Sequence, residues 1–265
     1  MTAPPVSAIQ SRDNAVFKAL RRLAQGNTDY RSQGRVWVEG DHLLRAALVR
    51  GVRPSLGIFS ETFWPLAQYE YAVAASKNIV FSDALFKQLS ALPSPVGLGF
   101  VFDLPVPAAL DGSARSVVLD RVQDAGNVGA ILRSASAFGW RQVIALRGTA
   151  ALWSPKVLRA GMGAHWNLAL IEGATELDLQ ALTAPLWVTS SHQGDFLHER
   201  VQRQDLPQQI NWAFGHEGQG VGAAVQALAS AHIRIAQPGG EESLNVAAAA
   251  AICLHASATA CRVGP

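Results

Sequence analysis

The second half of the chain alternates short apolar runs with helix-like segments, and this alternation is the strongest constraint on its fold. Strand-like runs are expected at 116–122, 142–146, 168–171, 186–189, 212–214 and 233–235, and helices at 128–138, 155–162, 177–182 and 244–260. Apolar strands joined by helices predict an α/β fold with a mostly parallel sheet that is buried on both faces. Ligands bind such sheets in the loops beyond the carboxyl ends of the strands, so the post-strand loops are where chemistry is expected.

The first hundred residues predict a separate, smaller α/β unit. Its first helix, 14–23, carries apolar side chains at helical spacing on one face (Val16, Phe17, Leu20 and Leu23) and basic side chains on the other (Lys18, Arg21 and Arg22). Strands at 35–39 and 56–60 and a helix at 42–50 follow. A stretch rich in Pro, Ala and turn residues then reads as a linker. The predicted domains are therefore 1–105 and 115–265, joined by a linker at 106–114.

The charge of the chain is uneven, and this predicts where a polyanion would bind. Residues 1–53 contain nine Lys or Arg and four Asp or Glu, a balance of +5, whereas the remaining residues contain thirteen and sixteen, a balance of −3. The basic surface therefore lies in the N-terminal part, and a polyanion is expected to bind there, with Lys18, Arg21 and Arg22 as its candidate contacts.

Composition excludes several classes of protein. A hydrophobic fraction of 49% with 16% charged residues excludes a disordered chain. No run of about 18 uncharged apolar residues occurs, so no membrane span is expected. The N-terminus has no apolar core that would serve as a secretory signal, and the two cysteines, Cys253 and Cys261, suit a reducing compartment, so a cytoplasmic location is expected. Those cysteines lack CxxC spacing, and no metal site is expected.

Three post-strand loops carry polar residues or glycines in unusual density. In the first, 119–139, Asn127 suits an N-cap, and Arg133 follows about one and a half turns later. By itself this loop also fits a capped helix with a solvated arginine. It lacks the GxGxxG fingerprint of dinucleotide-binding enzymes, which argues against that class.

The second loop favours a ligand that contains ribose or a positive centre, and the third leads into the last helix. Gly215–Gly222 holds four glycines in eight positions, which allow close backbone approach, and Glu217 in its middle would repel a phosphate. A flexible turn is the alternative. The third loop, 235–251, leads into an alanine-rich helix that Ser243 or Asn245 can cap and whose small residues permit close packing. Each loop alone is more often structural; the argument depends on the three together.

In this order and spacing, the loops resemble the three motifs of the SpoU/TrmH family of the SPOUT superfamily of RNA methyltransferases. The resemblance covers about 115–260 and rests on Asn127, Arg133, Gly215, Glu217, Gly218, Gly220, Ser243, Leu244 and Asn245. Residues 9–100 resemble the family's ribosomal-protein-like RNA-binding domain, with Val38, Glu39 and Gly40 at its usual Glu-Gly signature. The chain departs from the family at Ala125 and Ala236, where proline is usual, which affects loop geometry more than chemistry.

The resemblance implies a C-terminal trefoil knot, a homodimer whose site is completed across the interface, and S-adenosylmethionine as cofactor. It implies cofactor binding by Gly215, Gly218, Gly220, Ile235 and Leu244, and catalytic roles for Arg133, Asn127, Glu217, Ser243 and Asn245. The implied reaction is 2′-O-methylation of ribose in structured RNA, with 23S ribosomal RNA expected first and transfer RNA as the alternative. A non-catalytic RNA-binding protein of the same fold remains a second hypothesis, for which loss of Arg133 or Asn245 would be the sign; both are present.

Overall fold

The computed structural model describes residues 4–240 and 242–260, and the chain in it divides into two units. The N-terminal unit contains the chain up to Val106 and the segment Trp153–Trp166; the C-terminal unit contains Pro107–Leu152 and the chain from Asn167 onward. The sequence-based division did not anticipate that 153–166 belongs with the first unit. Long-range packing decides this, because helix α7 (Pro155–Gly161) contacts strand β2 (Arg35–Glu39), and no local pattern reports such a contact.

The N-terminal unit is built on a five-stranded mixed sheet of order β1-β4-β3-β5-β2. Strands β1, β4 and β3 run parallel, and β5 runs antiparallel to both β3 and β2. The other strands of this sheet are β1 (Val6–Ile9), β3 (Leu56–Ser60), β4 (Lys77–Phe81) and β5 (Leu98–Asp103). Its helices besides α7 are α1 (Ala15–Gln25), α2 (Asp29–Gln33), α3 (Asp41–Leu48), α4 (Trp64–Glu70), α5 (Asp83–Leu89) and the short 3₁₀ helix η1 (Ala72–Ala74).

Helix α1 has the predicted amphipathic character, with one correction. Phe17, Leu20 and Leu23 are buried, but Val16 is 42% exposed. Val16 lies in the first turn, where the side chain of Asn14 accepts a hydrogen bond from its N–H group at 2.8 Å and caps the helix. The apolar face therefore begins one residue later than the sequence pattern suggests.

The C-terminal unit confirms the predicted parallel sheet. Its seven strands lie in the order β10-β12-β9-β11-β6-β7-β8, and every paired neighbour is parallel. Strands β6, β7 and β11 are buried along their whole length, which explains their continuous apolar sequences. The strands are β6 (Ser116–Asp120), β7 (Gln142–Leu146), β8 (Ala169–Ala174), β9 (Leu186–Thr189), β10 (Asp195–Phe196), β11 (Asn211–Gly215) and β12 (Ala231–Arg234).

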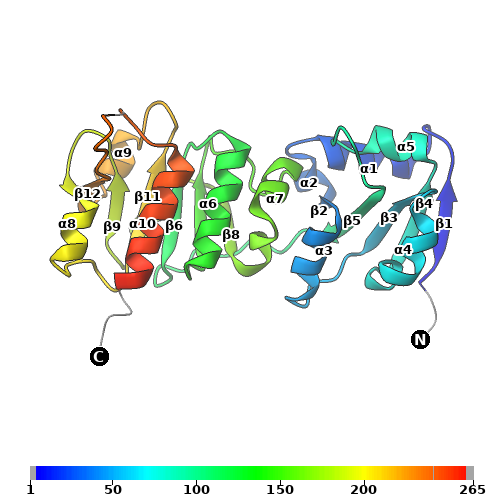
Figure 1. Cartoon of the computed structure of the whole chain (residues 1–265), viewed down its shortest axis with the longest axis horizontal. Coiled ribbons are helices and arrows are strands. Elements are labelled where there is room, and N and C mark those ends of the chain that lie inside the picture. The colour runs from blue at the N-terminus through cyan, green and yellow to red at the C-terminus, as the bar shows by residue number, and fades with distance from the viewer. Residues whose placement is uncertain (1–3, 241, 261–265) are drawn as a thin grey trace. The chain divides into compact units, whose positions relative to one another are not determined.

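Two long helices, α6 (Ala125–Ala137) and α10 (Val246–Ala260), lie side by side on one face of this sheet (Figure 1). The predicted last helix begins two residues later than expected, and the predicted helix at 177–182 is a 3₁₀ helix, η3 (Glu176–Ala181). The remaining helices are η2 (Ala164–Asn167), α8 (Leu197–Gln202) and α9 (Ala223–Gln226). The trefoil knot stays a prediction.

Candidate active site

The first predicted loop leaves β6 and enters α6, and its N-cap differs from the prediction. Asp124, not Asn127, caps α6: its side chain accepts the Asn127 N–H group at 2.8 Å. Aspartate and asparagine cap helices about equally well, so residue type alone did not reveal that the cap lies three positions earlier. Because the cap falls on Asp124, Asn127 lies inside the first turn, and its side-chain amide is available to other loops.

Asn127 joins the three predicted loops. Its Nδ2 donates to Glu217 Oε1 at 3.1 Å, and its Oδ1 accepts from Asn245 Nδ2 at 2.9 Å. These partners lie 90 and 118 positions away in the sequence. Since a carboxylate can only accept, the contact with Glu217 fixes which end of the Asn127 amide faces which neighbour. The structure thus places residues of all three loops in one hydrogen-bonded chain.

The carboxylate of Glu217 is held by the first loop. Oε2 accepts the backbone N–H of Gln123 at 3.2 Å, and Oε1 also accepts that of Asp124 at 3.1 Å. Burial, the largest single influence, raises the pKa of Glu217, but hydrogen bonds from the Asn127 side chain and three backbone N–H groups outweigh it and leave the pKa lowered. Glu217 is therefore an ionised acceptor that ties the second loop to the first.

The second loop is a tight turn that requires glycine. His216 and Gly220 exchange two backbone hydrogen bonds, of 3.1 and 2.8 Å, and His216 Nδ1 accepts from the N–H of Gly218 at 3.0 Å. A Cβ atom on Gly215 would lie 2.1 Å from the backbone of Gly220, and Gly220 has a φ of +67°. Gly215 is buried in β11. The close approach of the Gly220 backbone therefore requires glycine at position 215.

The third loop ends at the N-terminus of α10. Asn245 Oδ1 accepts the N–H groups of Ala247 at 2.9 Å and Ala248 at 3.2 Å, so Asn245 is the cap, one of the two candidates from the sequence. Ser243 is exposed, as is Arg133 on α6, and neither makes a hydrogen bond or ion pair with the described residues. Arg133 lies six residues beyond Asn127, about 9 Å along the helix axis, outside the hydrogen-bonded chain.

The loops around Asn127 present surfaces suited to a nucleoside-like cofactor. Cβ atoms built at Gly220, Gly239 and Gly240 would meet nothing within 4 Å, so backbone is open to a ligand there. Leu244 is 38% exposed and Ile235 is half-buried, which supplies apolar surface beside that backbone. Exposed peptide groups and aliphatic side chains are what a purine and a ribose need. These residues therefore fit S-adenosylmethionine.

Sequence reasoning missed the loop after β9. In the sheet, β9 lies between β11 and β12, so 190–194 leaves the sheet between the two loops predicted to bind cofactor. Ser190 Oγ accepts the N–H groups of His192 and Gln193, both at 3.2 Å. Gly194 has a φ of +102°, and a Cβ there would lie 2.0 Å from the carbonyl oxygen of His232. The available signal was a Ser- and Gly-containing turn directly after an apolar strand.

The three predicted RNA-binding residues are exposed on α1 of the N-terminal unit. Lys18 forms an ion pair with Asp13 at 3.1 Å, whereas Arg21 and Arg22 make no ion pair with the described residues. The basic face is therefore partly neutralised at Lys18, and its free charge is concentrated at the two arginines.

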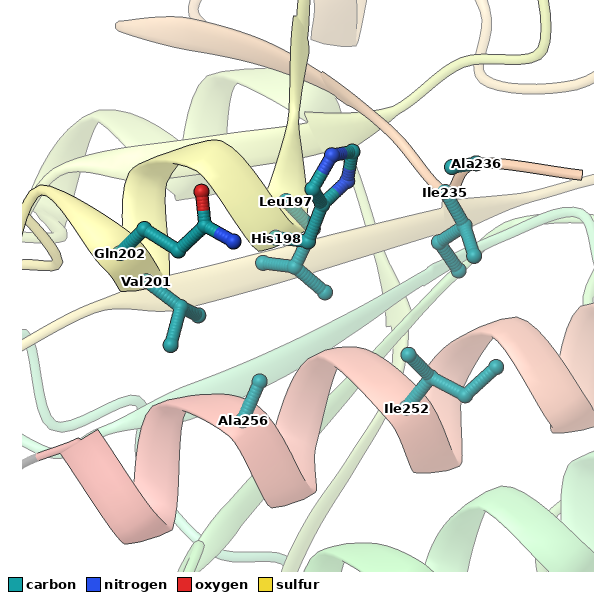
Figure 2. Close-up of a pocket in the computed structure, with 8 residues that line it drawn as sticks. All are labelled: Leu197, His198, Val201, Gln202, Ile235, Ala236, Ile252 and Ala256. Carbon is teal, nitrogen blue, oxygen red and sulfur yellow. The ribbon is translucent and has the colours of Figure 1, made fainter.

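An apolar groove of about 490 Å³ lies between α8 and α10 (Figure 2). Leu197 and Val201 of α8 line one side, and Ile252 and Ala256 of α10 line the other, with Ile235 at one end. Val201 is 37% exposed and Ile252 is 42% exposed.

Within the described residues, no three His, Cys, Asp or Glu side chains are placed to hold a metal ion. No helix among these residues is long and apolar enough to cross a bilayer.

The model of the SpoU rRNA Methylase family matches residues 114–255, which include all three loops and their hydrogen-bonded chain. This chain belongs to the SpoU rRNA methylase family. An uncharacterised tRNA/rRNA methyltransferase of Synechocystis is 32% identical to it over 94% of this chain and 93% of that protein. The 23S rRNA (guanosine(2553)-2′-O)-methyltransferase RlmP of Bacillus subtilis is 30% identical over 82% and 86%.

Solved structures agree with that membership. A TrmH-family protein from Porphyromonas gingivalis superposes with a TM-score of 0.77 and 28% identity, over 92% of this chain and 97% of that one. The predicted family and the parallel α/β fold are thus confirmed. S-adenosylmethionine is the methyl donor of this family. The roles of individual residues stay predictions.

Proposed function

We propose that this protein transfers the methyl group of S-adenosylmethionine to a ribose 2′-hydroxyl of 23S ribosomal RNA. Family membership and the relation to RlmP support the reaction class. The observation that carries the proposal is the hydrogen-bonded chain Glu217–Asn127–Asn245, which gathers three distant loops around open glycine backbone. With ribosomal RNA as substrate, the proposed place of action is the cytoplasm.

The cofactor would be held by the second and third loops. Backbone at Gly218, Gly220 and Leu244 and the side chain of Ile235 are the groups that would hold its nucleoside part. The bound cofactor supplies an already activated sulfonium methyl group. The protein therefore contributes mainly by aligning the acceptor oxygen with the methyl group and excluding water, because correct alignment alone removes much of the barrier.

Arg133 is the proposed residue for orienting the RNA. Its guanidinium has no partner among the described residues of its own chain, so it is available to a ribose hydroxyl or an adjacent phosphate. A guanidinium is a donor that stays protonated, so it cannot accept the hydroxyl proton by itself. We assign that proton to a phosphate oxygen held by Arg133. Ser243 is exposed in the third loop, makes no hydrogen bond with the described residues, and is also available to the RNA.

We further propose that the protein works as a homodimer. Helix α10 is rich in alanine and has no Asp, Glu, Lys or Arg, and Ile252 is exposed beside the groove that it shares with α8 (Figure 2). A second copy of the chain would cover this surface, and it would bring residues near Arg133 that one chain does not provide. Light scattering that gives 28.2 kDa, the mass of one chain, at micromolar concentration would contradict the dimer.

The decisive experiment is mapping of ribose methylation in total RNA from a deletion strain and from wild type. One ribose in 23S RNA should lose its methyl group and regain it when the gene is restored. Loss of a methyl group in transfer RNA instead would change the substrate but keep the reaction. An unchanged map, together with RNA binding by the pure protein, would favour the non-catalytic RNA-binding alternative.

A further inference from the structure

Asp120 is a buried carboxylate at the centre of the site that the proposed reaction does not use. It is the last residue of β6, is 2% exposed, and pairs with Gly215 in the sheet register. Removing a carboxylate from water is costly unless other groups compensate for the lost hydration. Here Oδ2 accepts the N–H of Gly222 at 2.6 Å and Oδ1 accepts from Arg121 Nε at 2.9 Å.

Asp120 holds both ends of the second loop, Gly215–Gly222. The loop starts at Gly215, which the sheet places beside Asp120, and it ends at Gly222, whose N–H binds the Asp120 carboxylate. Its tip is held as well, because Arg121 donates from a terminal guanidinium nitrogen to Gln219 Oε1 at 3.0 Å. A Cβ on Gly222 would lie 2.8 Å from the Arg121 guanidinium and 3.1 Å from Asp120 Oδ2, so both side chains pack closely against the backbone at the end of the loop.

Arg121 adopts an unusual backbone conformation in making these contacts. Its φ is +59°, a left-handed backbone conformation that residues other than glycine, asparagine and aspartate seldom adopt. The conformation is fixed from the other side by Thr149, whose Oγ1 accepts the Arg121 N–H at 3.1 Å and donates to the Leu119 carbonyl at 2.9 Å. Strained residues persist where the surroundings over-determine them, and they cluster at functional sites.

We propose that Asp120 and Arg121 are positioning residues that hold the loop Gly215–Gly222 in the shape that binds S-adenosylmethionine. The inference rests on the proposed function. Neither side chain acts on the methyl group; both act through the backbone of the loop. Their loss should therefore weaken cofactor affinity while leaving the rate at saturating cofactor near wild type.

The test uses Arg121→Gly in the full-length protein. Glycine accepts a φ of +59° without strain, so this variant removes the guanidinium while relieving the backbone, and it should fold. Arg147→Ala is the matched control, since Arg147 is an exposed arginine in the loop after the neighbouring strand β7 and is not bonded to the glycine loop. Two readouts are needed: amide hydrogen exchange of peptides within 215–223 without cofactor, and calorimetric binding of S-adenosylmethionine.

In Arg121→Gly, only the 215–223 peptides should exchange faster, and the cofactor Kd should rise about tenfold. This is the change expected when the charge-assisted hydrogen bond that holds the loop tip at Gln219 is lost. Arg121→Lys keeps the positive charge but loses the planar guanidinium that bonds two partners at once. Its exchange rate and cofactor Kd should lie between those of wild type and Arg121→Gly. Unchanged exchange in Arg121→Gly would overturn the proposal, as would faster exchange throughout the C-terminal unit, which would indicate a purely structural role. Absence of cofactor binding by wild type would refute the proposed function, while the exchange result would still test the loop.

Discussion

Asn245 performs two tasks that can be separated by substitution. Its Oδ1 caps α10, and its Nδ2 binds Asn127. Asn245→Ala removes both: loss of the cap costs about 1 kcal/mol, and loss of an exposed neutral hydrogen bond adds about 0.5 kcal/mol. The free energy of unfolding should fall by about 1.5 kcal/mol, which lowers Tm by about 3–6 °C for a protein of this size.

Asn245→Asp separates the two tasks. Aspartate caps a helix as well as asparagine does, and its charge is favourable at the helix N-terminus, where the first turn of α10 has no acidic residue. It cannot donate to Asn127 Oδ1. We therefore expect Tm within about 2 °C of wild type, but lower affinity for S-adenosylmethionine and slower single-turnover methylation, because Asn127 loses one of its two anchors.

The matched control is Asn14→Ala, which removes the N-cap of α1 in the N-terminal unit. It should cost a similar free energy of unfolding, yet leave affinity for S-adenosylmethionine unchanged. Thermal unfolding, calorimetric binding and single-turnover assays on the native RNA provide the measurements. Wild-type binding and turnover in Asn245→Asp would show that the Asn127–Asn245 contact is not part of the working site, and an unchanged Tm in Asn245→Ala would refute the capping argument.

Three further predictions follow from the same structure. Arg133→Ala should lower single-turnover methylation by about a hundredfold or more with cofactor affinity nearly intact; wild-type turnover would disprove its role. Neutralising Lys18, Arg21 and Arg22 together should weaken RNA binding and flatten its salt dependence, with Lys18 contributing least because Asp13 pairs with it. Glu217→Gln should be less stable than wild type at pH 7; since folding lowers the pKa of Glu217, the difference should vanish as pH falls through its folded pKa, as acid titrations of Tm would show.

Local sequence patterns predicted much of the C-terminal unit. Continuous apolar runs gave the position of β6, β7 and β11, because strands buried on both faces need no polar alternation. The order of strands could not be predicted, since parallel neighbours are brought together by crossovers that leave no trace in either strand. Strand β10 has only two residues, too few for any period to show.

The candidate site shows the same division between local and long-range information. Loop chemistry and family resemblance together singled out Asn127, Glu217 and Asn245, which the structure joins directly. Asp120 was overlooked, because a single carboxylate at a strand end has no pattern. Its importance appears only when Gly222, 102 positions away, is seen to bind it.

The segment Trp153–Trp166 limits how this protein can be divided into fragments. Val157 and Leu158 are buried, and the ring of Trp166 packs against that of Phe102 in a tilted arrangement with centroids 4.9 Å apart, all within the N-terminal unit. A fragment that starts near residue 107 would keep these side chains but lose the surface that shelters them, and would tend to aggregate. Gene fragments, domain swaps between relatives and fusion proteins should therefore carry both units.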